Sequence, residues 1–220
     1  PGVELEAGQV YDANAPMIAA LVASTGAIST DLGVMPDDAE IVRARLQEAA
    51  GRFDVLITSG GASRGEEDHV VRTLDAIGRR HLWQIAIKPG RPMSFGQIGD
   101  TIFIGLPGNP VAVFVCFLLY AWPMLVALSG APWPEPRRLK LRSAFSVPGK
   151  KTGRREYWRG MLRDGPDGLR ADKYARDGSG LITSLRMADG LIEADESLGA
   201  VKEGDEVTFI PLASYGIGRF

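Results

Sequence analysis

Apolar and polar positions along the first 130 residues follow a pattern that predicts helices and strands in turn. Apolar residues at helical spacing predict helices over 15–25, 38–50 and 66–77, and short apolar runs predict strands over 27–34, 53–58, 82–87 and 94–106. The last run contains Gly99-Asp100, which predicts a hairpin turn. Alternating elements with short connections are typical of a three-layer α/β domain with a mostly parallel sheet.

The stretch from Val111 to Leu128 carries no charge and reaches the lower length limit of a membrane span. Pro123 interrupts it, and Asn109-Pro110 before it resembles an N-cap followed by proline at the first helical position. We therefore expect a buried core helix rather than a membrane segment.

The pattern changes at APWPEP, residues 131–136, where alternating prolines stiffen the backbone and remove hydrogen-bond donors. Beyond this predicted linker, short β-type runs are separated by glycine, proline and aspartate, with a hairpin tip expected at 163–169. We expect an α/β domain over 1–133 and a small all-β domain, barrel-like or a compact sandwich, over 137–220.

Composition narrows the class of protein. The 220 residues are 45% hydrophobic and 24% charged, which indicates an ordinary soluble chain with a sizeable core. The net charge of −2 argues against a general nucleic-acid surface. The single cysteine, Cys116, excludes an internal disulfide and a cysteine-cluster metal site, and its apolar neighbours predict a core filler. A cytoplasmic location fits best.

Three turns carry the candidate chemistry, and the first is TSGGASRGEED. Its glycines follow a predicted strand and allow backbone amides to approach an oxygen-rich ligand. A purely structural turn is the alternative. The candidate ligand-binding residues are Ser59, Gly60, Gly61, Ser63 and Gly65.

Two carboxylates lie close to this turn in the predicted fold. Asp68 follows it within one helical turn, and Asp37 ends the loop that precedes the neighbouring strand. Carboxylates beside a phosphate-binding loop need a cation between them and the ligand, and oxygen ligands suit Mg²⁺. The alternatives are an N-cap at Asp37, in a capping box with Glu40, and a helix-dipole role for Asp68.

The second turn, IKPGRP, presents Lys88 and Arg91, which suit an oxyanion, although two solvated surface cations are the alternative. The third turn, GLPGNPV, leads into a predicted helix whose free N–H groups attract anions. A helix-capping loop alone is the alternative there. The candidate binding residues of the third turn are Pro107, Gly108, Asn109 and Pro110.

The order of the motifs SGGASRGEEDHV, WQIAIKPGRPMSFG, IGLPGNPVA, REYWRG and DGSGLITSLRMADGLI resembles the molybdopterin molybdenumtransferase family, which includes gephyrin and plant counterparts. The resemblance implies a molybdopterin-binding α/β domain followed by a small β domain, like the gephyrin E domain. It also implies N-terminal family domains, absent from this chain, that supply an acidic active-site residue and much of the dimer architecture.

The resemblance further implies insertion of molybdate into adenylylated molybdopterin with release of AMP, in a homodimer that contacts the adenylyltransferase of the same pathway, without nucleic acid or membrane. Asp37 and Asp68 match acidic positions that hold Mg²⁺, and Lys88 matches the lysine of the KPG turn. Arg159 and Ser179 match residues of the oxyanion site.

One position departs from the family pattern, because Gln84 stands where many members have a second lysine. Two other functions fit parts of the sequence. The α/β domain also resembles the molybdopterin adenylyltransferase, and the whole architecture resembles gephyrin acting as a non-catalytic scaffold. The attached β domain and the PGNP turn favour the molybdenumtransferase.

Overall fold

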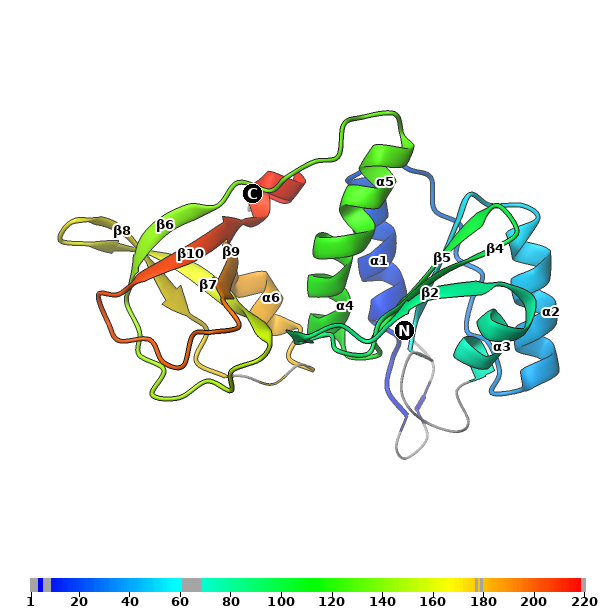
Figure 1. Ribbon diagram of the computed structural model, residues 1–220, viewed down its shortest axis with the longest axis horizontal. Coiled ribbons are helices and arrows are strands. Elements are labelled where there is room, and N and C mark those ends of the chain that lie inside the picture. Colours follow the sequence, from blue (N-terminus) through cyan, green and yellow to red (C-terminus); the bar gives the residue numbers. More distant parts are fainter. Residues whose placement is uncertain (1–3, 6–8, 61–68, 177, 179, 219–220) are drawn as a thin grey trace.

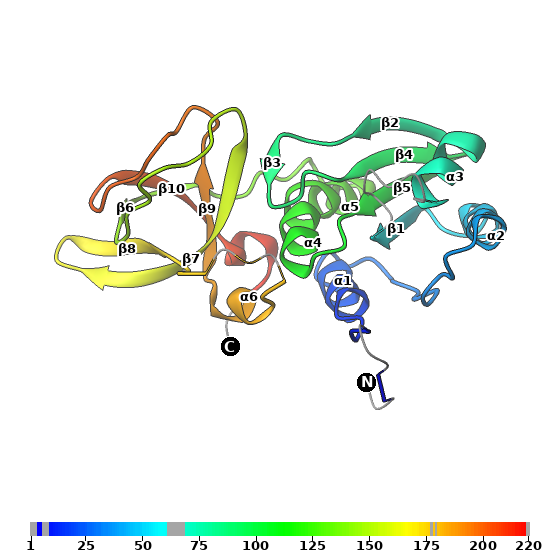
Figure 2. The same ribbon diagram turned by 90° about the horizontal axis from the view of Figure 1, so that it is seen from below.

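The computed structural model describes residues 4–5, 9–60, 69–176, 178 and 180–218 of the chain. Two β-sheets lie on either side of a layer of helices (Figures 1 and 2). Across Figure 1 the helices are α2 (Ala39–Ala50) and α3 (His69–Ile77) outside the first sheet, and α1 (Asn14–Ala23), α4 (Pro110–Cys116) and α5 (Trp122–Leu128) between the sheets. This arrangement confirms the predicted class, a three-layer α/β part followed by a β-rich part.

The first sheet is mixed. Its described strands, in the spatial order β1-β5-β4-β2, are β1 (Val55–Ser59), β5 (Thr101–Leu106), β4 (Ser94–Ile98) and β2 (Arg79–Trp83). Strands β1 and β5 run parallel, whereas β5–β4 and β4–β2 are antiparallel. The sheet is less parallel than predicted because the hairpin at Gly99, with φ of 58°, reverses the chain within two residues.

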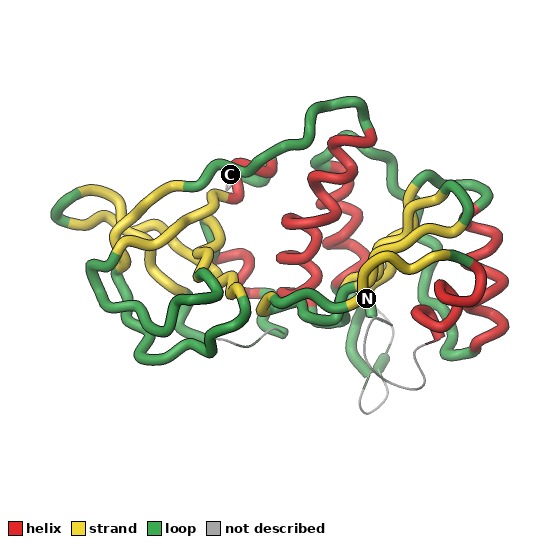
Figure 3. The backbone as a smooth tube through the Cα atoms, in the orientation of Figure 1, coloured by secondary structure: helices red, strands yellow, loops and turns green. Residues whose placement is uncertain are grey.

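The second sheet closes on itself. Its ring consists of β6 (Leu139–Ser143), β7 (Arg155–Gly165), β8 (Gly168–Lys173), β9 (Gly190–Ala194) and β10 (Glu206–Pro211). Closure follows because β7 pairs with both β8 and β9. The predicted hairpin tip lies between β7 and β8, whereas the short helix α6 (Thr183–Met187) interrupts the expected all-β pattern. The result is a barrel, seen on the left of Figure 3.

One strand crosses between the two parts. Strand β3 (Ile87–Lys88) precedes the proline-rich segment in the chain, yet it pairs in parallel with the start of β7 in the second sheet. The division at 133–137 stays a prediction, and the second candidate turn lies against the barrel.

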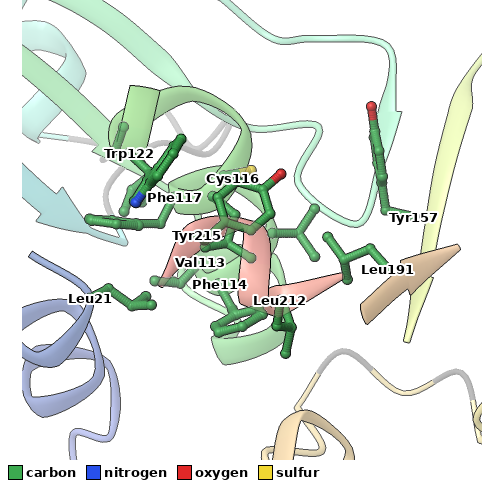
Figure 4. Close-up of a cluster of buried hydrophobic side chains, with 14 of the residues drawn as sticks. Leu21, Val113, Phe114, Cys116, Phe117, Trp122, Tyr157, Leu191, Leu212 and Tyr215 are labelled. Carbon is green, nitrogen blue, oxygen red and sulfur yellow. The ribbon is translucent and has the colours of Figure 1, made fainter. Parts of the chain in front are cut away.

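One hydrophobic cluster of the described residues joins the two parts (Figure 4). Leu21 of α1 and Phe114 of α4 belong to the same buried cluster as Leu191 of β9. Tyr215, in the 3₁₀ helix Leu212–Tyr215 after the barrel, meets the ring of Trp122 edge-on with 4.9 Å between ring centroids. The barrel therefore packs on the helical layer through apolar contact.

The helix from Pro110 to Leu128 is, within the described part of the chain, the one long and apolar enough to cross a membrane, and 67% of its apolar window is buried. It packs between α1 and the barrel (Figure 1). The π-helical turn Phe117–Ala121 precedes Pro123, and a wider turn suits a residue that has no N–H to donate. These contacts support the predicted core helix.

Two predicted strands were wrong. Residues 27–34 form an irregular segment in which Ile28 is 97% exposed and Val34 is 78% exposed, because the segment pairs with no described strand. The run 82–87 is split between β2 and β3, because Gln84 adopts a φ of 65° and interrupts the extended backbone. The other predicted elements lie within a few residues of their expected places.

Candidate functional site

The first and third turns meet at the start of the long helix. The N–H of Gly60 donates to the carbonyls of Leu106 and Pro107, at 3.1 and 3.3 Å. A Cβ on Gly108 would lie 3.7 Å from the Cα of Gly60, so the two backbones are in close contact. Ser59 ends β1 immediately before this contact. The first and third turns therefore lie side by side at the end of β1.

Asn14 ties the N-terminal helix to the same place. Its side-chain amide donates to the carbonyl of Gly108 at 2.8 Å, across 94 positions of sequence. Its Oδ1 is buried and has no partner among the described residues. Asp12 lies two residues before α1, and its Oδ1 accepts from the N–H groups of Asn14 and Ala15 at 2.8 and 3.2 Å. Nothing in the local sequence indicated this distant contact.

Asn109 and Pro110 begin the long helix as expected. Asn109 is the N-cap residue in an extended conformation, and Pro110 occupies the first turn. The Asn109 side chain makes no capping hydrogen bond, and both Gly108 and Asn109 are exposed. The helix start therefore places two exposed residues, Gly108 and Asn109, at the end of the helix whose dipole favours an anion.

Asp37 is exposed and is not the helix cap. Its Oδ1 lies 3.6 Å from Nε2 of His69, the first residue of α3, and its side chain is 85% exposed. Asp38 caps α2 instead, accepting from the N–H groups of Glu40 and Ile41 at 2.9 and 3.0 Å. The predicted capping box at Asp37 was wrong, and its carboxylate remains available to a ligand or cation.

Five predicted site residues lie outside the described part of the structure: Gly61, Ser63, Gly65, Asp68 and Ser179. Their roles stay predictions. His69 follows Asp68 directly in sequence, so Asp37 contacts the neighbour of the second predicted metal ligand. No group of three or more histidine, cysteine or acidic residues suited to a metal occurs among the residues that the structure describes.

Lys88 lies at the barrel rather than beside the other two turns. Strand register pairs it with Glu156, and its Nζ lies 3.6 Å from a Glu156 oxygen. Behind it, the carbonyl of Gly90 accepts a long hydrogen bond from Cys116 at the last residue of α4. Because α4 has seven residues, this contact lies about 9 Å along the helix from Pro110. The three turns thus form two neighbouring groups.

Glu156 is the charged centre of the second group. Its side chain is only 5% exposed, and its two oxygens accept from Arg154 and from Nε1 of Trp158 at 3.0 and 3.1 Å. Burial alone would raise the pKa of Glu156, but these hydrogen bonds and the charge of Lys88 outweigh burial and hold the pKa below its usual value. Glu156 is therefore an ionised partner for Lys88.

Arg159 is buried and supports a loop. Its guanidinium donates to the carbonyls of Arg176 and Gly178, at 2.6 and 3.4 Å, and lies over the ring of Tyr174. It is 5% exposed. Arg159 and Glu156 are three positions apart on β7, so their side chains leave opposite faces of the strand. Within the described chain, Arg159 shapes the loop next to Ser179 rather than contacting Lys88.

A cavity of about 400 Å³ lies away from these turns. It is at the barrel beside β9 and β10, lined in part by Trp158, Ile192 and Val207. Cys116 is buried, and burial raises the pKa of its thiol to about 12, so it stays protonated. The predicted filler role of Cys116 fits this environment, and the candidate chemistry remains with the turns.

Comparison with known proteins agrees with this arrangement. Residues 2–127 match the family described as a probable molybdopterin binding domain, and residues 140–212 match the MoeA C-terminal region, domain IV. A molybdopterin molybdenumtransferase of Haemophilus influenzae is 33% identical over 213 residues, which are 96% of this chain and 52% of that protein. One of Nostoc sp. is 35% identical over 206 residues, 91% of this chain and 42% of that protein.

A solved structure of the molybdopterin biosynthesis moea protein from Pyrococcus horikosii superimposes with a TM-score of 0.80 at 30% identity, covering 96% of this chain and 50% of that one. The chain thus spans about half the length of the curated relatives it matches. The chain belongs to the family of probable molybdopterin-binding domains, and its second part matches the MoeA C-terminal region.

Proposed function

We propose that this chain forms the substrate-binding part of a molybdopterin molybdenumtransferase, which inserts molybdate into adenylylated molybdopterin and releases AMP. The observation that carries the proposal is the contact of Gly60 with Pro107 and Gly108 at the start of the long helix. The two family relatives named above carry that activity in their names.

The turn group suits the phosphate end of such a ligand. Exposed Gly108 and Asn109 stand at a helix start, where unpaired N–H groups and the helix dipole favour an anion. The close approach of Gly60 keeps side chains away from this surface. The adjoining glycine loop, with Gly61, Ser63 and Gly65, would complete the binding of the pyrophosphate.

The Lys88 group suits the oxyanion. A half-exposed ammonium held at one side by a buried carboxylate offers its remaining hydrogens to molybdate. Arg159 would act indirectly by fixing the loop that ends at Ser179. Gln84, close in sequence to Lys88, contributes no charge.

Mg²⁺ is proposed as the cation. Asp37 offers an exposed carboxylate that no helix end uses, and Mg²⁺ commonly keeps several waters while binding one or two carboxylates. Asp37 and Asp68 would hold it beside the glycine loop. When bound, the cation would neutralise phosphate charge and polarise the phosphoanhydride.

The finer partners follow the family and are proposals as well. We propose a homodimer, in which the loop fixed by Arg159 serves the oxyanion site across the subunit interface, transient contact with the adenylyltransferase that supplies the nucleotide, and a cytoplasmic location.

The test is AMP release from adenylylated molybdopterin in the presence of molybdate and Mg²⁺. We expect Asp37→Asn and Asp68→Asn to lower the rate at least about 100-fold, the loss typical of a removed electrostatic contact in an active site. Asp100→Asn, on the exposed hairpin tip, should leave the rate unchanged. Undiminished AMP release by both site variants would refute the assigned roles.

A further inference from the structure

Glu156 carries a buried, ionised carboxylate, which lowers the stability of a protein unless other groups compensate for it. Its side chain is 5% exposed, and a buried charge needs partners to offset its lost hydration. Arg154 binds one oxygen at 3.0 Å, and Trp158 donates to the other at 3.1 Å. Arg154, immediately before β7, and Trp158 on β7 thus fix both oxygens of the carboxylate.

The same fixed carboxylate meets Lys88. The Lys88 Nζ lies 3.6 Å from Oε2, the oxygen that also accepts from Trp158. Backbone register holds the two residues opposite each other, since Ile87 pairs with Arg155 and Lys88 with Glu156, and the N–H of Arg155 donates to the carbonyl of Ala86 at 2.9 Å. A lysine side chain has several rotatable bonds, so an anchored acceptor restricts it where the backbone alone does not.

The net charge around Lys88 argues against the idea that Glu156 strengthens anion binding by electrostatic attraction. Lys88 and Arg154 contribute two positive charges and Glu156 one negative charge, which leaves a net charge of +1. Replacing Glu156 by a neutral residue would raise the net charge to +2 and increase the electrostatic attraction for a dianion. The carboxylate therefore lowers the positive field at Lys88, and its benefit must come from orientation.

We propose that Glu156 is a positioning residue, which holds the Lys88 ammonium in the direction needed to contact the oxyanion substrate. The inference rests on the proposed function for the identity of the anion. It links the barrel to the α/β part, because Glu156 belongs to β7 and Lys88 to the second turn.

Molybdate titration by calorimetry tests the proposal, because loss of orientation would weaken molybdate binding whereas loss of the negative charge alone would strengthen it. We expect Glu156→Gln to bind molybdate about tenfold more weakly than the wild-type chain, the size of one lost charge-assisted contact. Glu156→Asp should recover part of the affinity, and Glu156→Gln should have no further effect in a Lys88→Met background. Glu196→Gln is the matched control, since it removes a half-exposed carboxylate that pairs with Arg155.

A second measurement is independent of molybdate. Acetylation of Lys88, followed by peptide mass spectrometry and referenced to exposed Lys140, should rise in Glu156→Gln and stay unchanged in Glu196→Gln. Equal or tighter molybdate binding by Glu156→Gln would overturn the proposal. If the wild-type chain binds no molybdate, the proposed function fails first. Unchanged Lys88 acetylation would then overturn the positioning role, and increased acetylation would support it.

Discussion

Lys150 offers the sharpest stability test, because its ammonium lies among main-chain carbonyls. It donates to the carbonyls of Asp195 and Arg154 at 2.7 and 2.8 Å, with longer contacts of 3.4 Å to those of Lys151 and Leu198. This cluster ties the segment before β7 to the segment after β9. Lys150→Met keeps most of the aliphatic stem and removes the donor.

The magnitude follows from the two short contacts. A hydrogen bond from a charged donor contributes about 1.5–3 kcal/mol, and partial exposure of Lys150 places each at the lower end. Lys150→Met should therefore lower the free energy of unfolding by about 2–3 kcal/mol, which is roughly 5–10 °C in Tm for a chain of this size.

Urea denaturation followed by tryptophan fluorescence measures this change, with the m value showing whether the unfolded state is altered. Lys151→Met is the matched control: Lys151 is exposed, and the change should cost less than about 0.5 kcal/mol. Equal stability of Lys150→Met and Lys151→Met would refute the role of the carbonyl cluster.

Three further outcomes are expected. The thiol of Cys116 should react with a disulfide reagent at pH 8 only as fast as the chain unfolds, since burial raises its pKa to about 12; rapid labelling of the folded chain would contradict this. Glu156 has a lowered pKa when folded, so its contribution to stability is present above its usual pKa of 4.5 and is lost as pH falls through the folded value. The stability difference between wild type and Glu156→Gln should shrink between about pH 5 and 3, and a constant difference in urea titrations would be the opposing result. Gly90→Ala should lower Tm by roughly 4 °C or more, because Gly90 has a φ of 114° and a Cβ there would clash with Cys116; an unchanged Tm in calorimetry would count against it.

Local signals predicted the features that depend on neighbours in sequence. Asn109-Pro110 marked the helix start, Gly99-Asp100 the hairpin, and the apolar run 111–128 the core helix. Each depends on short-range sterics or on burial of a continuous apolar surface.

Long-range pairing was not predictable in the same way. Asn14 contacts Gly108 across 94 positions of sequence, and Lys88 pairs with Glu156 across 68. No periodic pattern in the sequence indicates contacts of this kind. Asp37 and Asp38 are adjacent aspartates, and only the backbone conformation determines that Asp38 is the helix cap. Family resemblance supplied the remaining candidate residues.

The proposed function requires that the joined first and third turns bind the phosphates of adenylylated molybdopterin. Gly108→Asp probes this binding, because a Cβ at Gly108 meets only ordinary contact at 3.7 Å and the new carboxylate would stand at the anion site. Gly149→Asp adds the same charge where no atom lies within 4 Å. In calorimetric titrations with adenylylated molybdopterin, we predict at least about tenfold weaker binding by Gly108→Asp and unchanged binding by Gly149→Asp. Equal affinity of the two variants and the wild-type chain would contradict the claim.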